Sequence, residues 1–272
     1  MINYNGEIVN FSKEVLTVNN RAFKYGDALF ETIKANNSNI HFLEDHYFRL
    51  MASMRMLRME IPMSFTMDYF ENELSKTIEA NNLQDARVRI TVYRKDGGLY
   101  TPDTNKVDFI IEANPLKEMF KGNYEVDLFK DYFIYSGLLS TIKTTNKLTN
   151  VLASIYASEN NLDNCILLNE KKQLVEAING NIFLVNGNTV KTPSISEGCV
   201  KGIIRKKIIE IIAKQSIYTI EETEISPFDI QKADELFITN TIVGVQSVTS
   251  YRKSFFKTTV AQELSLALKK LV

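Results

Sequence analysis

The sequence lacks tryptophan and has few residues that bind metals, with only two cysteines and two histidines among its 272 residues. Cys165 and Cys199 are far apart and lack the paired spacing of metal ligands, so we expect buried thiols in a reducing compartment. His41 and His46 argue against a histidine-rich metal site and against a His-dependent catalytic triad placed elsewhere in the chain. No bound metal is expected, and acid–base chemistry must depend mainly on Lys, Tyr, Asp or Glu.

The sequence also lacks an excess of charge and a long apolar run. Its 32 basic and 33 acidic side chains give a formal net charge of −1, which provides no electrostatic reason to expect nucleic acid or an anionic membrane as a partner. The first residues, MINYNGEIVNF, have no basic region followed by an apolar stretch, and no segment reaches about 18 uninterrupted apolar residues. We expect a soluble, cytoplasmic protein.

The first third of the chain alternates between strand and helix patterns. INYNGEIV, at residues 2–9, has an Asn-Gly turn signal between alternating residues and predicts a hairpin. Strands are predicted for ALFETIKAN (28–36), ARVRITVYR (86–94) and KVDFIIEANPL (106–116). Amphipathic helices are predicted within residues 41–59 and over about 65–81. These patterns indicate a layer of helices and mainly antiparallel adjacent strands.

The periodicity weakens over residues 114–123, which is the best candidate for a linker. Beyond it, GLLSTI (137–142) is strand-like and runs through a polar turn into a helix. Residues 164–193 predict three short strands, and GIIRKKIIEIIAKQS (202–216) predicts a helix. ADELFITNTIVGVQSV (233–248) predicts a buried strand that ends in a small polar loop, before a C-terminal helix.

Several polar residues lie where the predicted strands end, and each has an ordinary structural interpretation. Lys143 lies in a polar turn, where a lysine is normally solvated. Glu176 lies within the apolar LVEAI, where an ionised carboxylate needs a partner or must face water. Arg49 alone would be a surface charge, and Thr239–Thr241 would cap a turn.

One hypothesis unites these residues. The N–H groups of Ile203 and Ile204 lie in the first turn of a predicted helix, a position that binds phosphate well, although many helices begin this way. Thr241 and Arg49 are candidates for the same phosphate, Glu176 is an acid that can face a ring nitrogen, and Lys143 is an amine that can form an imine. Together these groups indicate a pyridoxal phosphate site.

At this point the sequence resembles the class IV aminotransferase family of pyridoxal-phosphate enzymes, which includes branched-chain aminotransferases, D-amino acid aminotransferases and aminodeoxychorismate lyases. The motifs that carry the resemblance occur in the family's order along nearly the whole chain. They are RAFKYGDALFET (21–32), HFLEDHYFRL (41–50), IKTTNKLTNVLA (142–153), VEAINGNIFLV (175–185) and KTPSISEGCVKGIIR (191–205). The resemblance implies an α+β fold of type IV, D-amino acid aminotransferase-like, with a small N-terminal α/β domain at 1–117 and a larger C-terminal domain at 118–272 that carries the cofactor lysine.

The resemblance also implies roles for individual residues. Lys143 matches the Schiff-base lysine, which is also the catalytic base, and Glu176 matches the acid paired with the pyridine nitrogen. The remaining matches fall into two groups. The cofactor contacts are Arg49, Asn181, Ile203, Ile204 and Thr241, and the substrate side is formed by Tyr25 and Phe30, with Arg89 or Arg94 as receptor of a substrate carboxylate.

The family contains both lyases and transaminases, and the two reactions differ only after the substrate carbanion has formed. The K-x-x-N spacing of Lys143 and Asn146, the T-N-T loop at 239–241 and the short chain resemble the lyase, which converts 4-amino-4-deoxychorismate to 4-aminobenzoate and pyruvate in folate biosynthesis. YRKDGGLYTP (93–102) matches the lyase loop only in part, and Phe30-Glu31 matches the branched-chain pattern better. We favour the lyase, and the alternative is a branched-chain or D-amino acid transaminase that uses 2-oxoglutarate.

Two further expectations follow from the resemblance. The expected partner is a small-molecule amino substrate. In this family a loop of the neighbouring subunit usually completes the active site, so the resemblance also implies a homodimer. A cofactor-free binding protein on the same fold is the non-enzymatic alternative, but Lys143 and Glu176 are both retained. Lys147, four residues after Lys143, is interpreted as a pocket-rim or surface charge.

Overall fold

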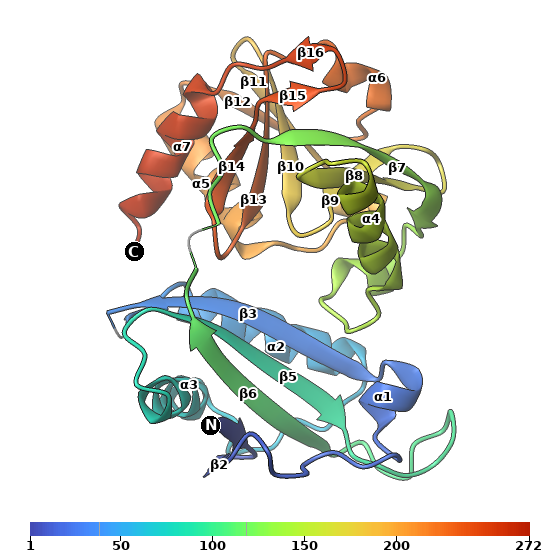
Figure 1. The fold of residues 1–272 in the computed structure, drawn as a ribbon, viewed down its shortest axis with the longest axis vertical. Helices are drawn as coiled ribbons and strands as arrows, with labels where there is room; N and C mark the ends of the chain where they lie inside the picture. Colours follow the sequence, from blue (N-terminus) through green and yellow to red (C-terminus); the bar gives the residue numbers. More distant parts are fainter. Residues whose placement is uncertain (38, 118) are drawn as a thin grey trace. The chain divides into compact units, whose positions relative to one another are not determined.

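The computed structural model describes residues 1–37, 39–117 and 119–272. The chain divides into two compact units (Figure 1). The first comprises Met1–Lys117 with Lys143–Asn146, and the second comprises Glu118–Ile142 with Lys147–Val272. The sequence places its domain boundary at residue 118, which lies outside the described residues. Lys143 groups by its contacts with the first unit, whereas the sequence analysis assigns it to the C-terminal domain.

The first unit is built on a six-stranded antiparallel sheet in the order β2-β1-β6-β5-β3-β4. Its strands are β1 (Ile2–Tyr4), β2 (Glu7–Val9), β3 (Ala28–Asn36), β4 (Asn39–Ile40), β5 (Ala86–Arg94) and β6 (Val107–Pro115). Its helices are α1 (Arg21–Tyr25), α2 (Leu43–Met56) and α3 (Met67–Ala80). The predicted hairpin, the three longer strands and both amphipathic helices are confirmed.

Residues alternate between the two faces of β3, and this alternation positions the candidate site. Leu29, Glu31 and Ile33 are buried on the face that α2 covers, whereas Phe30 and Thr32 point to the other face and are only half-buried. Side chains in a strand alternate with a period of two, so neighbouring residues of β3 belong to different environments. Phe30 and Glu31 therefore take part in separate clusters.

The second unit contains two five-stranded sheets, ordered β12-β11-β10-β13-β14 and β16-β15-β7-β8-β9. The first sheet consists of β10 (Asn181–Asn186), β11 (Thr189–Pro193), β12 (Thr219–Thr223), β13 (Glu235–Asn240) and β14 (Gly244–Val248). The second consists of β7 (Glu125–Ile134), β8 (Asn164–Asn169), β9 (Leu174–Ala177), β15 (Ser250–Tyr251) and β16 (Ser254–Phe255). Apolar side chains from both sheets, among them Leu128, Ile166, Ile182 and Leu236, form one buried core.

Helices cover the outer faces of this unit. They are α4 (Leu148–Glu159), α5 (Ile203–Gln215), α6 (Pro227–Ile230) and α7 (Thr259–Lys269), with short 3-10 helices η1 (Leu138–Thr141) and η2 (Ile195–Glu197). The helix α4 lies against β7 and β8 (Figure 1). There the rings of Phe129 and Tyr156 are in contact, with a centroid distance of 5.7 Å. Cys165 and Cys199 are both buried, as expected. In the described part of the chain, no helix is both long and apolar enough to cross a membrane.

The second unit differs from the sequence prediction in three places. GLLSTI is not a strand, because residues 138–141 form η1. Residues 164–193 form four strands, since LVEA pairs separately as β9 between β8 and a short turn at 177–180. The predicted strand over 233–248 is a hairpin, in which Asn240 caps the turn by accepting hydrogen bonds from the N–H groups of Ile242 and Val243.

Candidate functional site

Lys143 is held by backbone pairing with the edge of β3. Its carbonyl accepts a hydrogen bond from the Phe30 N–H at 2.9 Å, and two residues later the Thr145 N–H donates to the Ala28 carbonyl at 3.1 Å. The Asn146 side chain continues this contact by donating to the Gly26 carbonyl at 3.1 Å. A lysine on an unpaired turn would be mobile, whereas these bonds fix the backbone from which the Lys143 side chain extends.

The Lys143 side chain lies over an aromatic ring that it shares with an arginine. Its Nζ is 4.5 Å from the centroid of Phe30, and the guanidinium carbon of Arg89 is 3.8 Å from the same centroid. Cations are attracted to the face of an aromatic ring. Phe30 and Arg89 lie on the face of the sheet opposite α2, because Thr32 pairs directly with Arg89 and Phe30 with Thr91. The structure thus brings Lys143, Phe30 and Arg89 together.

Arg94 lies in a different environment from Arg89. It is buried, its Nε donates to Asp27 at 2.9 Å, and its Nη2 donates to the Leu57 carbonyl at 2.7 Å. Asp27 also accepts a hydrogen bond at 2.9 Å from Arg21, whose Nη1 donates to the carbonyls of Gly97 and Leu99. Arg94 therefore belongs to an ion cluster that ties loops to the sheet. Tyr25 packs nearby against the ring of Tyr100, at a centroid distance of 5.6 Å.

Arg49 lies beside a buried carboxylate on the α2 side of the sheet. Its Nε donates to Glu31 Oε1 at 2.7 Å and its Nη2 donates to Glu31 Oε2, while His46 Nδ1 lies 2.8 Å from Oε2. Burial raises the pKa of Glu31, but the charge of Arg49 and the hydrogen bonds from both partners outweigh burial and lower that pKa to about 2. The Glu31 side chain is therefore a carboxylate at neutral pH.

In the second unit, Glu176 and Asn181 bind the same peptide segment. Glu176 Oε2 accepts a hydrogen bond from the Val200 N–H at 2.9 Å, and Asn181 Nδ2 donates to the Val200 carbonyl at 2.9 Å. Both side chains are buried. Asn181 also lies against Gly202, where an added Cβ would be only 1.9 Å from its Oδ1. These contacts fix the loop that leads directly into α5.

The start of α5 offers groups that suit a phosphate. Its N-terminal cap is Gly202, and no described side chain caps the helix, so the first-turn N–H groups at Ile203 and Ile204 face outward from its end. The Thr239 hydroxyl is buried and has no hydrogen-bond partner among the described residues, and Thr241 is half-buried in the turn after β13. Backbone N–H groups and hydroxyls that can donate to a phosphate, together with the buried carboxylate of Glu176 that can accept from a protonated ring nitrogen, fit a phosphorylated cofactor with a basic ring nitrogen.

The predicted site residues thus form a group within each unit. The first unit brings Lys143 together with Phe30 and Arg89, and places Arg49 beside Glu31. The second unit links Glu176 and Asn181 to the start of α5. Sequence reasoning missed the roles of Glu31, His46 and Val200. His46 and Arg49 are three positions apart on a helix, which places them on one face and was a usable signal, whereas nothing in the local sequence marks the Val200 backbone.

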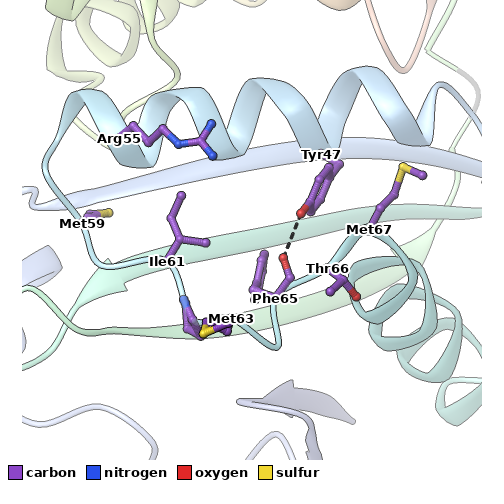
Figure 2. Close-up of a pocket in the computed structure, with 9 residues that line it drawn as sticks. Tyr47, Arg55, Met59, Ile61, Met63, Phe65, Thr66 and Met67 are labelled. Carbon is purple, nitrogen blue, oxygen red and sulfur yellow. Dashed lines mark hydrogen bonds between the residues drawn. The ribbon is translucent and has the colours of Figure 1, made fainter.

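A cavity of about 560 Å³ lies elsewhere in the first unit, between α2 and the segment that leads into α3 (Figure 2). Figure 2 shows the Tyr47 hydroxyl directed at the Phe65 carbonyl, to which it donates at 2.9 Å. The lining is Tyr47, Arg55, Met59, Ile61, Pro62, Met63, Phe65, Thr66 and Met67. It includes none of the residues that the sequence analysis assigns to cofactor or substrate, so this cavity is separate from the predicted site.

Known proteins resemble this sequence over most of its length. The family model described as amino-transferase class IV matches residues 28–251. A Methanocaldococcus jannaschii protein whose name proposes a branched-chain-amino-acid aminotransferase is 29% identical over 248 residues, which cover 90% of this chain and 85% of the relative. The D-alanine aminotransferase of Bacillus licheniformis is 25% identical over 254 residues, covering 91% and 87%.

Solved structures show the same fold. A Legionella pneumophila protein whose name proposes a 4-amino-4-deoxychorismate lyase superposes with a TM-score of 0.89 at 21% identity. The superposition covers 96% of this chain and 97% of that protein. At this identity the likeness establishes the type IV fold and leaves the reaction open.

Proposed function

Because this chain belongs to the class IV aminotransferase family, we propose that it is an amino acid aminotransferase, with the lyase reaction as the second candidate. It is an enzyme that uses pyridoxal 5'-phosphate, the cofactor of the family. The observation that supports the proposal best is the placement of Lys143, whose backbone is paired with β3 and whose amine lies 4.5 Å from the Phe30 ring, beside Arg89.

We propose that Lys143 binds the cofactor covalently and is released as a free amine when the amino group of the substrate takes its place. The freed amine then accepts the proton from the substrate α-carbon. When bound, the cofactor's protonated ring withdraws electrons from that carbon. Lys143 must be a neutral amine when it takes the proton, because a general base has to be unprotonated at the pH at which the enzyme works. The carboxylate of Glu176 holds the proton on the ring nitrogen, and Arg49, the start of α5 and Thr241 bind the phosphate.

Arg89 is the better candidate for the receptor of a substrate carboxylate. Its guanidinium shares the Phe30 ring with Lys143, so it lies on the same side of the sheet as the reacting amine. Arg94 instead donates to Asp27 and to loop carbonyls within a buried cluster. Moving Arg94 onto a substrate would break its bonds to Asp27 and to the Leu57 carbonyl, and would leave Asp27 with Arg21 as its remaining arginine partner.

The choice between transaminase and lyase rests on the relatives. The curated proteins reported above match about nine-tenths of this chain and carry aminotransferase names, and we therefore place the transaminase first. The lyase remains the second candidate because of the K-x-x-N spacing, the T-N-T loop and the Legionella structure.

One experiment separates the two reactions. The purified protein is offered aminodeoxychorismate alone and, separately, L-leucine, L-valine or D-alanine with 2-oxoglutarate, with the Lys143→Ala variant as a blank. We expect keto acid and glutamate from one of the amino acids and no pyruvate from aminodeoxychorismate. Pyruvate and 4-aminobenzoate from aminodeoxychorismate, without amino transfer, would instead establish the lyase.

We also propose that the chain forms a homodimer. Support comes from exposed apolar side chains of the second unit, which lie on one side of α4, at the end of β7 and in η1. These side chains, 42–78% exposed, are Tyr132, Phe133, Tyr135, Leu138, Leu139, Leu148, Val151 and Ile155. The three α4 residues are spaced i, i+3 and i+7, the pattern of a helix face that packs against a partner.

A further inference from the structure

Glu31 holds Arg49 through two hydrogen bonds from one edge of the guanidinium. Oε1 accepts from Nε at 2.7 Å and Oε2 accepts from Nη2. Paired bonds of this kind fix the plane of an arginine as well as its position. The arginine side chain is 13% exposed and the carboxylate 2% exposed, so water competes little for these bonds.

His46 fixes the carboxylate in turn. Its ring is fully buried, and Nδ1 lies 2.8 Å from Glu31 Oε2. An ionised carboxylate only accepts hydrogen bonds, so Nδ1 must carry the proton. Nε2 has no hydrogen-bond partner among the described residues. Within the described part of the chain, the one side-chain partner of this buried ring is the carboxylate that holds Arg49, so the ring orients that carboxylate.

Stability alone is a poor explanation for this arrangement. Burying a carboxylate and a guanidinium costs solvation, and well-packed apolar residues of similar volume often give equal or greater stability. Glu31 also lies among the apolar side chains of its strand face, between Leu29 and Ile33, where an apolar residue would pack. The buried ions are better explained by the orientation that they give Arg49.

We propose that Glu31 and His46 are positioning residues, which hold the Arg49 guanidinium in the orientation that binds the cofactor phosphate. The inference rests on the proposed function, in which Arg49 contacts that phosphate. Glu31 sets the guanidinium plane through two hydrogen bonds. His46 sets the carboxylate plane through a third.

The test compares the affinity of the apoenzyme, prepared from purified holoenzyme, for pyridoxal phosphate and for pyridoxal, which lacks the phosphate. The variants are His46→Leu, which removes the Nδ1 donor, and His46→Asn, whose amide nitrogen can replace that donor although its side chain is smaller. Arg49→Leu reports the direct contact. Thermal unfolding of each apoenzyme is measured in parallel.

We expect His46→Leu to weaken binding of pyridoxal phosphate about tenfold, the effect of losing the geometry of one charged hydrogen bond, and to leave pyridoxal binding unchanged. His46→Asn should recover most of the phosphate-dependent affinity. In the Arg49→Leu background, His46→Leu should have no further effect on this affinity. A purely structural role for His46 predicts instead that both ligands lose affinity together and that Asn rescues nothing, and this result would overturn the inference.

The inference and the proposed function fail in different ways. If Arg49→Leu binds pyridoxal phosphate as wild type does, Arg49 does not contact the phosphate, and both the role proposed for Arg49 and the inference are wrong. If the wild-type protein binds no pyridoxal phosphate, the proposed function itself is wrong. If Arg49→Leu loses that affinity and His46→Leu does not, only the inference is wrong. Should His46→Leu fail to fold, Glu31→Gln makes the same test, because a neutral amide accepts at only one of the two oxygen positions.

Discussion

Lys143 and Lys147 lie four positions apart, yet their surroundings differ. Lys143 pairs through its backbone with β3 and faces Phe30, whereas Lys147 is the residue that precedes the first turn of α4. We expect Lys143→Ala to abolish the borohydride-trapped cofactor adduct and to reduce turnover by about 10²–10⁴-fold or more. Lys147→Ala is the matched control and should keep both. An adduct that persists in Lys143→Ala, or disappears in Lys147→Ala, would assign the cofactor amine to another lysine.

Glu176 serves two purposes in the proposed site, and the two can be separated. Its Oε2 accepts the Val200 N–H, and its charge is proposed to hold a proton on the cofactor ring. Glu176→Gln keeps an oxygen acceptor but removes the charge, so we expect kcat to fall on the order of 10²-fold while cofactor affinity changes much less. Steady-state kinetics and cofactor titration check this prediction. Near-normal turnover would show that the charge of Glu176 is not needed to keep the ring nitrogen of the cofactor protonated.

Glu31 makes the stability of the first unit depend on pH. Its pKa is lowered from an ordinary value of 4.5 to about 2, so the folded state prefers the carboxylate. The difference corresponds to about 3 kcal/mol, which is fully present above about pH 4.5 and is lost as the pH falls towards 2. Denaturant unfolding of wild type and Glu31→Gln should therefore differ most near pH 6 and converge at acid pH. A pH-independent difference would contradict the prediction.

At the scale of elements, the approach of α5 to β10 depends on a glycine. A Cβ at Gly202 would lie 1.9 Å from Asn181 Oδ1, so Gly202→Ala must displace the side chain that holds the Val200 carbonyl. We expect a loss of about 1–3 kcal/mol of stability and weaker binding of pyridoxal phosphate. Urea unfolding and cofactor titration measure the two effects. Gly187→Ala, at a turn glycine with no heavy atom near an added Cβ, is a control for general glycine replacement, although its positive φ adds strain of its own.

The sequence predicts an element well when the residues within the element determine its structure, and poorly when distant residues do. The sequence predicts the strand β5 residue for residue, because buried and more exposed residues alternate from Ala86 to Val92. The sequence predicts a strand where residues 138–141 form a 3-10 helix, since four apolar and small residues carry no period that distinguishes the two. The strand β7 was not identified, because its second half is exposed and its pairing partner β8 lies about 40 residues later.

The residues of the candidate site can also be divided into those that the sequence predicts and those that it cannot. Motif spacing singled out Lys143, Glu176 and Arg49 for chemistry, and their roles stay predictions until tested. The spacing could not show that Arg94 forms a salt bridge with Asp27, because that contact joins residues 67 positions apart. Nor could it show the Val200 backbone between Glu176 and Asn181, since a peptide group has no sequence signature.

At the scale of the whole molecule, the proposed homodimer depends on the apolar face of α4. Val151 and Ile155 are 51% and 49% exposed, and their spacing of four places them on the same side of that helix. Exposing such a face to water is unfavourable, whereas a second copy would bury it. Ile155→Glu would place a charge within the buried interface. We expect it to weaken the dimer on the order of 30-fold or more.

Light scattering across a dilution series measures this effect, with wild type remaining a dimer at concentrations where Ile155→Glu is monomeric. Leu266→Glu is the matched control, because Leu266 is 62% exposed on α7, outside this apolar face. A monomeric wild type, or a dimer that only Leu266→Glu disrupts, would contradict the assigned interface. If the site borrows a loop from a neighbouring subunit, the monomeric Ile155→Glu variant should also lose turnover while circular dichroism shows that it is still folded, because separating the copies removes part of each site.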